Sequence, residues 1–307
     1  MNFFKYHGLG NDYLVIDPAD IDPADIDTAV TGEGPAAELA GDSAGGLTKE
    51  MIRALCHRHY GLGSDGILLG PRPTADGFGV RIFNPDGSEA EKSGNGLRIF
   101  ARYLWDTRRV DEAPFTMNTL GGKVNARVLD KGRLVEVDMG RVDFEAARIP
   151  VAGLTGPVVN LVKIVAGRRI TYCAATVGNP HCLVLCDDIS RELAEDLGPI
   201  LEIDPAFPNR ANVQFMKVID RATVAIEIWE RGAGYTLACG SAASVAAATA
   251  RRLDKCDSKI AVMMPGGRLD MMVKDDYSVR LTGPVVKIAA GHVCRSLFES
   301  FSAQPGV

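Results

Sequence analysis

The chain repeats one sequence pattern in its two halves. The first copy is NPDGSEAEKSGNG (84–96), and the second is GAGYTLACGSAAS (232–244). Apolar residues typical of a strand precede each copy (80–83 and 224–229), the copy itself contains a glycine turn, and it leads into a run suited to a helix. Ser93 and Cys239 take the same place in the two copies, 146 positions apart (239 − 93). A chain that repeats a strand, a turn and a helix start in this way is expected to fold as two related halves.

A second, shorter repeat supports the first. Asn11 lies in a Gly-Asn pair before an apolar strand (GNDYLVID), and Asn179 lies in a similar pair (GNPHCLVL). Asn11 and Ser93 are 82 positions apart (93 − 11), whereas Asn179 and Cys239 are 60 apart (239 − 179), so the first half carries about 22 extra residues. The segment at about 18–46 accounts for them. It duplicates Asp-Pro-Ala-Asp-Ile and continues with Gly, Ala and Ser, a composition typical of a solvated surface insertion.

Most of the remaining chain alternates in short segments bounded by glycine turns, which predicts strands. Helices are expected over four segments: 48–59, 97–105, 190–199 and 239–252. Many strands with few helices predict an α+β protein with curved, mostly antiparallel sheets, each wrapped around one main helix. We expect two pseudo-symmetric domains: residues 1–135 with 286–307, and residues 136–285. The last segment, 285–299, is expected to return to the first domain.

Composition narrows the classes of function. The 307 residues, 46% of them hydrophobic, suffice for two cores. The net charge is −5 and the basic residues are spread along the chain, which argues against a nucleic-acid partner. No apolar run approaches the roughly 18 residues of a membrane helix, and the start lacks signal-peptide features, so a cytoplasmic protein without a membrane partner is expected. Seven cysteines without a C-x-x-C pair fit neither a disulfide framework nor structural zinc, so no metal site is expected.

The sequence GLGSDG (61–66) has the spacing of a dinucleotide-binding fingerprint but lacks its setting. Such a fingerprint follows a strand and opens a helix. Here the expected helix comes before the glycines and the expected strand, 67–69, comes after them. The segment is therefore interpreted as a helix end followed by a turn.

Cys239 is expected at the N-terminus of a helix. That position exposes unpaired backbone N–H groups and the positive end of the helix dipole, which binds anions and lowers the pKa of a thiol. If the two repeated helix starts face each other, a carboxylate held by both leaves Cys239 and Ser93 on opposite faces of the neighbouring carbon. Such a pair can take a proton from one face of an α-carbon and return one to the other, which inverts the centre.

Taken jointly, the motifs resemble the diaminopimelate epimerase family of cofactor-independent amino-acid epimerases. The motifs are HGLGNDYLVID (7–17), GLGSDG (61–66), FNPDGSEAEKSGNG (83–96), GNPH (178–181), NVQF (212–215) and ERGAGYTLACGS (230–241). The resemblance covers the chain apart from the insertion. It implies interconversion of LL- and meso-diaminopimelate by two-face proton transfer at the α-carbon, in lysine and peptidoglycan precursor synthesis. It also implies a small diamino acid as the partner and no cofactor, and it leaves a homodimer open.

In this family two cysteines act as the base and acid pair. The resemblance assigns Cys239 as one of them, and Ser93 stands in the place of the other. It also implies a set of residues that hold a substrate with two amino-acid ends: Asn11, Asn84, Asn179, Asn212, Glu230 and Arg231. A further set takes the place of the backbone cradle for the substrate carboxylate: Gly94, Asn95, Gly240 and Ser241.

Two positions depart from the family pattern. A hydroxyl is a much weaker acid than a thiol, so the Ser93 form is expected to be impaired. Tyr235 stands where the family has glutamate and where the first half keeps Glu89, and its effect on Cys239 is left open.

Several interpretations of Ser93 stay open. Ser93 is either an engineered cysteine-to-serine change or a natural residue. In the second case the chain is a slow or one-base relative, an epimerase of another amino acid, or a non-catalytic amino-acid-binding homologue. A rival is an isomerase of the proline-racemase type, which would prefer a cyclic secondary amine and make no use of Arg231.

Overall fold

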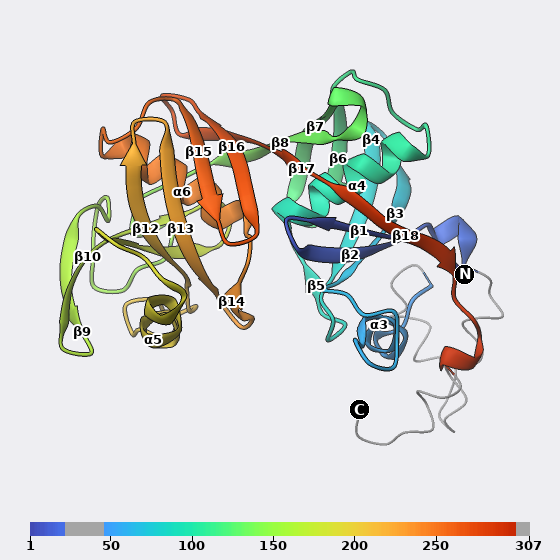
Figure 1. The fold of residues 1–307 in the computed structure, drawn as a ribbon, viewed down its shortest axis with the longest axis horizontal. Coiled ribbons are helices and arrows are strands. Elements are labelled where there is room, and N and C mark those ends of the chain that lie inside the picture. Colours follow the sequence, from blue (N-terminus) through green and yellow to red (C-terminus); the bar gives the residue numbers. More distant parts are fainter. Residues whose placement is uncertain (22–45, 299–307) are drawn as a thin grey trace. The chain divides into compact units, whose positions relative to one another are not determined.

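The computed structural model describes residues 1–21 and 46–298. The chain divides into two compact units: unit 1 is formed by Met1–Val135 and the segment that begins at Val285, and unit 2 is Glu136–Pro284. Strands and helices occur in both units (Figure 1), so the expected mixture of α and β structure is confirmed. Most of the expected insertion at 18–46 lies outside the described residues. At its start, Pro18–Asp20 form a short 3-10 helix, η1, capped by the Asp17 side chain.

Unit 1 contains a mixed sheet. Its strands are β1 (Asn2–Gly8), β2 (Asn11–Ile16), β3 (Ile67–Thr74), β4 (Gly77–Phe83), β5 (Glu89–Ala90), β6 (Phe115–Thr119), β7 (Gly122–Leu129) and β18 (Val286–His292). The β2–β3 and β4–β6 pairs are parallel, and β1–β2, β3–β4, β4–β5 and β6–β7 are antiparallel. β18 pairs antiparallel with β1 and lies beside it in Figure 1. The predicted return of the last segment to the first part of the chain is therefore confirmed.

Within the described part of unit 1 there are two α-helices, and the short 3-10 helix η3 (Asp130–Gly132) comes before β8. α3 (Lys49–Cys56) begins at Thr48, whose Oγ1 accepts a hydrogen bond from the Met51 amide at 3.2 Å. α4 (Gly94–Asp106) contacts β1, β2, β3 and β7, and it is buried along most of its length. α4 is therefore the central helix of unit 1, and strands of the sheet surround it.

Unit 2 has the same kind of organisation. Its strands are β8 (Leu134–Arg141), β9 (Leu161–Val165), β10 (Arg168–Thr176), β11 (Pro180–Leu185), β12 (Asn212–Asp220), β13 (Thr223–Glu230), β14 (Gly234–Thr236), β15 (Lys259–Met264), β16 (Gly267–Val273) and β17 (Ser278–Pro284). The β11–β12 and β13–β15 pairs are parallel, and the β9–β10, β10–β11, β12–β13, β15–β16 and β16–β17 pairs are antiparallel. α5 (Arg191–Glu202) packs on β12 and β13.

α6 (Gly240–Arg252) is the central helix of unit 2. It contacts β10 to β13 and β15 to β17, and the alanines from Ala242 to Ala250 are fully buried. Small side chains allow strands to approach the helix axis from several directions, which explains why this run is so rich in alanine. The sheet therefore fixes the start of α6 as firmly as unit 1 fixes the start of α4.

Three predicted helix boundaries are wrong. The helix expected at 97–105 already begins at Gly94, where Ser93 caps it. The helix expected at 48–59 ends at Cys56, because the amides of Leu62 and Gly63 turn back to the Leu55 carbonyl at 3.0 and 3.1 Å. The helix expected at 190–199 continues to Glu202. The glycines of GLGSDG follow a helix end and precede β3, so the interpretation of that segment as a turn is confirmed. Among the described residues, no helix is both long enough and apolar enough to cross a membrane.

Candidate active site

Ser93 is the N-cap residue of α4. Its backbone is extended (φ −136°, ψ 117°), and its Oγ accepts a hydrogen bond from the Gly96 amide at 3.0 Å. The Tyr13 hydroxyl lies 3.1 Å from the same Oγ. The serine therefore caps the central helix of unit 1 and also contacts a phenol.

Cys239 has the equivalent place in unit 2. It is the N-cap residue of α6, with backbone angles of φ −141° and ψ 122°, close to those of Ser93. Its side chain is buried, and Sγ lies 3.3 Å from the Ser241 Oγ. The sequence repeat is thus matched by the same local backbone geometry at both helix starts.

Burial raises the pKa of the Cys239 thiol well above its usual range. The Glu230 carboxylate raises it further through its negative charge and a hydrogen bond, while the Ser241 hydroxyl and the Ala242 backbone amide at the helix start lower it. The helix start therefore lowers the pKa as predicted, but burial and Glu230 outweigh it, so the net direction is opposite to the expected one. The physical reason is that lost hydration and a neighbouring carboxylate both disfavour the thiolate.

Cys239 is consequently expected to react slowly with iodoacetamide at pH 7.5, and more slowly than the exposed Cys294. Glu230→Gln removes the negative charge and should speed alkylation of Cys239, by about tenfold for each unit by which the thiol pKa falls. Mass spectrometry of the two cysteine-containing peptides measures both rates. Equal rates at Cys239 in the native protein and in Glu230→Gln would show that the carboxylate does not control this thiol.

A chain of side-chain hydrogen bonds supports the start of α4. The fully buried Arg98 donates to the Asn95 Oδ1 at 2.9 Å and to the Gly94 carbonyl at 3.2 Å. Asn95 in turn donates to the Asn11 Oδ1 at 3.0 Å, and Asn11 donates to an Asp65 carboxylate oxygen at 2.8 Å. Four of the predicted site residues, Ser93, Gly94, Asn95 and Asn11, are therefore brought together at one end of α4.

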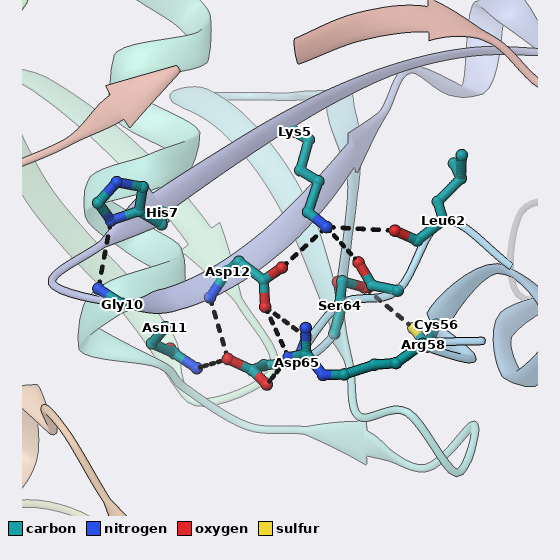
Figure 2. A network of polar contacts seen from close by, with 12 residues as sticks. Lys5, His7, Gly10, Asn11, Asp12, Cys56, Arg58, Leu62, Ser64 and Asp65 are labelled. Carbon is teal, nitrogen blue, oxygen red and sulfur yellow. Dashed lines mark hydrogen bonds and ion pairs between the residues drawn. The ribbon is translucent and has the colours of Figure 1, made fainter. Parts of the chain in front are cut away.

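Asp65 and Asp12 tie this group to the rest of unit 1. Figure 2 shows Lys5 and Arg58 pointing toward the Asp12 carboxylate, with nitrogen–oxygen distances of 3.0 and 2.9 Å. Burial alone would raise the pKa of Asp12, but hydrogen bonds from Arg58 and Lys5 lower it below its usual value. The Asp12 amide also donates to Asp65 at 3.0 Å. The sequence analysis interpreted Asp65 only as part of a turn. Its place in the motif GLGSDG (61–66), one of those shared with the family, could have marked it as a site residue.

Asn84 is placed differently from the other predicted residues of unit 1. Its Nδ2 donates to the Ser88 Oγ at 3.0 Å, and its backbone amide bonds to the Ser88 carbonyl at 2.8 Å. Both contacts close the exposed 84–88 turn. In the described contacts, Asn84 is therefore a turn residue rather than a member of the group around Ser93.

Asn179 and Asn212 meet at the β11–β12 pair of unit 2. His181 pairs in register with Asn212, and its Nε2 lies 2.9 Å from the Asn179 Oδ1. Asn212 accepts from the Arg231 amide at 3.1 Å, and its Nδ2 donates to the Pro180 carbonyl at 3.1 Å. The predicted residues of this half are thus connected through strand ends, and His181 is the buried residue that links them.

Arg231 and Glu230 lie at the end of β13. Arg231 is exposed and donates through Nη1 to the Asn209 carbonyl at 2.8 Å. Glu230 accepts a hydrogen bond from the Thr236 Oγ1 at 2.7 Å and lies beside the Cys239 thiol. The structure therefore brings Glu230 together with Cys239 and Ser241.

Burial lowers the pKa of His181 to about 4. An unfolded histidine has a pKa of about 6.5, so between pH 6.5 and 4 the unfolded chain binds one more proton and stability falls as pH falls. The free energy of unfolding should therefore depend less on pH in His181→Gln, by up to about 1.4 kcal/mol per pH unit. Urea unfolding from pH 7 to 4.5 measures this, with His59→Gln, at an exposed histidine, as the control. An unchanged pH slope in His181→Gln would contradict the assignment.

The Tyr235 departure is matched by a second one. The Tyr235 hydroxyl donates to a Glu227 carboxylate oxygen at 2.7 Å, and the Arg191 guanidinium lies 4.8 Å from the centre of the tyrosine ring. At the positions 146 residues earlier, Glu89 accepts from Arg81 at 2.9 and 2.6 Å. In unit 1 the later residue of the pair, Glu89, carries the carboxylate, whereas in unit 2 the earlier residue, Glu227, carries it. A hydrogen bond between the side chains in unit 2 therefore replaces an ion pair in unit 1. Sequence reasoning missed Glu227, which the repeat offset would have identified.

Comparison with known proteins assigns the family. The family model described as diaminopimelate epimerase matches residues 3–145 and 173–288. "Diaminopimelate epimerase 2" of Nostoc sp. is 53% identical over 299 residues, which cover 97% of each chain. The chain belongs to the diaminopimelate epimerase family. A diaminopimelate epimerase of Moorella thermoacetica is 36% identical over 95% of this chain and 98% of its own. The family resemblance found in the motifs is confirmed.

Solved structures show how widely the fold of this family is shared. A hydroxyproline epimerase from Agrobacterium vitis with bound trans-4-hydroxy-L-proline superposes with a TM-score of 0.65 at 16% identity, over 95% of this chain and 90% of its own. A predicted epimerase from Pseudomonas aeruginosa gives 0.61 at 20% identity, over 95% and 98%. At these identities the likeness concerns the fold alone. In residues 1–21 and 46–298, no cluster of three or more His, Cys, Asp or Glu side chains could hold a metal ion.

Proposed function

We propose that this chain interconverts LL- and meso-diaminopimelate by proton transfer at the α-carbon, as in lysine and peptidoglycan precursor synthesis. The observation that carries this proposal is the Cys239 thiol at the start of α6, beside Glu230, in a chain 53% identical to a protein named diaminopimelate epimerase 2. A buried thiol next to a carboxylate is suited to a cationic ligand, because an ammonium group would offset the carboxylate charge, which adds to burial in disfavouring the thiolate.

Substrate binding supplies that cation in the proposed mechanism. The α-ammonium group pairs with Glu230, which lowers the pKa of Cys239 and allows its thiolate to form. The thiolate then removes the α-proton, and an S–H bond forms as the C–H bond breaks. The negative charge moves into the substrate carboxylate, where it must be met by fixed hydrogen-bond donors.

The donors come from the two helix starts. Backbone amides at the N-terminus of a helix favour an anion without rearranging. We assign this role to Gly94, Asn95, Gly240 and Ser241. Arg231 offers a planar guanidinium for the distal carboxylate of a substrate with two amino-acid ends. We assign the binding of the remaining substrate groups to this set: Asn11, Asn84, Asn179, Asn212, Glu230 and Arg231. The two units are then related halves of one enzyme, a view supported by the matching backbone angles at positions 93 and 239.

Ser93 serves the opposite face of the α-carbon in this proposal. A hydroxyl gives and takes a proton less readily than a thiol, so net inversion by this form is expected to be slow. Cys239 alone can still remove the α-proton of one stereoisomer and return a solvent-derived one to the same face. Exchange that is much faster than inversion is therefore the expected signature of the native protein, whether Ser93 is natural or engineered.

Deuterium incorporation into diaminopimelate in heavy water tests the proposal. The native protein should label one stereoisomer, LL or meso, faster than it converts that isomer into the other. Cys239→Ala should abolish the labelling, and the exposed Cys294→Ala should keep it. If diaminopimelate stays unlabelled while another amino acid, such as a proline derivative, is labelled, the substrate assignment is wrong. If diaminopimelate binds but no amino acid is labelled, the chain is a non-catalytic binding protein.

A further inference from the structure

We infer that Tyr13 acts through Ser93 as a proton relay, so that a serine can serve where the family has a thiol. This inference rests on the proposed function and adds a residue to it. The Tyr13 hydroxyl lies 3.1 Å from the Ser93 Oγ, and either oxygen can donate the hydrogen of that contact.

The contacts of Ser93 favour such a relay. A serine hydroxyl can accept two hydrogen bonds and donate one. The Gly96 amide already donates to the Ser93 Oγ at 3.0 Å. When Tyr13 donates as well, both acceptor positions are filled, and the hydrogen of Ser93 must point away from both partners. The Ser93 hydrogen is then available to a reacting carbon, and the Tyr13 hydroxyl can donate its own hydrogen to the Ser93 oxygen.

The Tyr13 ring is held in place by its surroundings. Tyr13 lies on β2, opposite Tyr6 of β1, and its side chain is buried. Gly66, just before β3, lies against the ring, and a Cβ atom there would come within 2.7 Å of the Tyr13 Cε1. The same Cβ atom would come within 2.4 Å of the Phe83 carbonyl oxygen, so both this backbone oxygen and the ring close the space at position 66.

The phenol accompanies the hydroxyl half of the repeat and not the thiol half. The offset between Asn11 and Asn179 is 168 positions, so the residue that corresponds to Tyr13 is His181 (13 + 168). The His181 ring nitrogens contact Asn179 and Gln214. The half of the repeat that carries the Cys239 thiol thus has a histidine on the equivalent strand, whereas the half that carries the Ser93 hydroxyl has a phenol in contact with that hydroxyl.

The proton transfers balance. In one direction, the Ser93 O–H bond breaks as a new C–H bond forms at the α-carbon, and the Tyr13 hydrogen moves to the Ser93 oxygen, which leaves a tyrosinate. In the other direction, Ser93 takes the α-proton while tyrosinate takes the serine hydrogen. A phenol has a pKa of about 10, far closer to that of a thiol than an aliphatic hydroxyl is, so charge on Tyr13 costs less than charge on Ser93. The relay assigns Tyr13 a role through Ser93 rather than on the substrate itself, so Tyr13 is a positioning residue.

Tyr13→Phe, made in the native protein and in Ser93→Cys, tests the relay. Removing one acid–base partner typically costs about 10²–10⁴ in rate, so Tyr13→Phe should slow exchange and inversion from the Ser93 face at least tenfold in the native protein. In Ser93→Cys the same change should cost less than about threefold, because a thiol ionises without a relay. Tyr103→Phe, at another buried tyrosine of unit 1, is the control and should change neither rate.

The outcomes separate the inference from the proposed function. An equal loss in both backgrounds would show that the Tyr13 hydroxyl is only structural, and no loss in the native protein would show that it is not used. Native protein that exchanges no proton at the Ser93 face would also overturn the relay. Absence of exchange and inversion in Ser93→Cys itself would instead contradict the proposed function.

A second measurement covers a Tyr13→Phe variant that does not fold. Site-specific 3-fluorotyrosine at position 13 keeps the hydroxyl and lowers its pKa. The pH profile of kcat for the Ser93-face reaction should then move to lower pH, with no shift in the Ser93→Cys background. An unmoved profile would overturn the relay, since a structural hydroxyl would leave the profile unchanged.

Discussion

Ser93→Cys is expected to raise the rate of net inversion of diaminopimelate by about 10²–10⁴-fold, the usual contribution of one member of an acid–base pair. The change puts a thiol at the N-cap of α4, where the backbone has nearly the angles found at Cys239. Circular dichroism of the product stereoisomers, or a coupled assay for meso-diaminopimelate, measures the rate with the native protein alongside.

A matched control is available for this substitution. Ser190 caps α5 through its Oγ, which accepts from the Leu193 amide at 3.2 Å, much as Ser93 caps α4. Ser190→Cys should lose a similar capping bond, worth roughly 1 kcal/mol, with no gain in inversion. An unchanged inversion rate in Ser93→Cys would mean that position 93 does not serve the reacting carbon.

Exchanging the two residues, Ser93→Cys with Cys239→Ser, is expected to reverse which stereoisomer takes up deuterium. The native protein carries its thiol at the start of α6, and the exchanged protein carries it at the start of α4. If the two positions serve opposite faces of the α-carbon, the isomer that was labelled rapidly becomes the slow one, by about 10²–10⁴-fold. Labelling of each isomer in heavy water, followed by mass spectrometry, measures the change.

The single variant Cys239→Ser is the control for the exchange. It should label neither isomer rapidly, because both positions then carry hydroxyls. If the exchanged protein labels the same isomer as the native protein, both positions serve the same face and the two-face mechanism is wrong.

The features that the sequence predicts well are those that recur along the chain. The repeat around Ser93 and Cys239 predicted two helix starts, and both form with almost the same backbone angles. One feature that joins distant parts of the chain was predicted as well: the last segment returns, and β18 pairs with β1. Periodicity and turn residues are local signals, and here they agree with the fold.

The features that the sequence did not reveal depend on contacts between distant residues. The Tyr13–Ser93 contact joins residues 80 positions apart, and the Asn11–Asp65 bond joins residues 54 apart. The net direction of the Cys239 pKa was missed because the helix start, which lowers that pKa, is visible in a sequence, whereas the burial and the Glu230 carboxylate that outweigh it are not. The assignment of Asn84 to substrate remains a proposal, since its described contacts close a turn.

The buried Arg98 gives the two helix starts different sensitivities to acidity. Its guanidinium, in contact with Asn95 and the Gly94 carbonyl, stays protonated at every pH at which the protein is folded. A bound anion at the start of α4 therefore meets a constant positive field. The start of α6 carries a thiol that must ionise before it can react. Dissociation constants for anionic ligands of unit 1 should accordingly vary little with pH, while turnover follows the titration of unit 2.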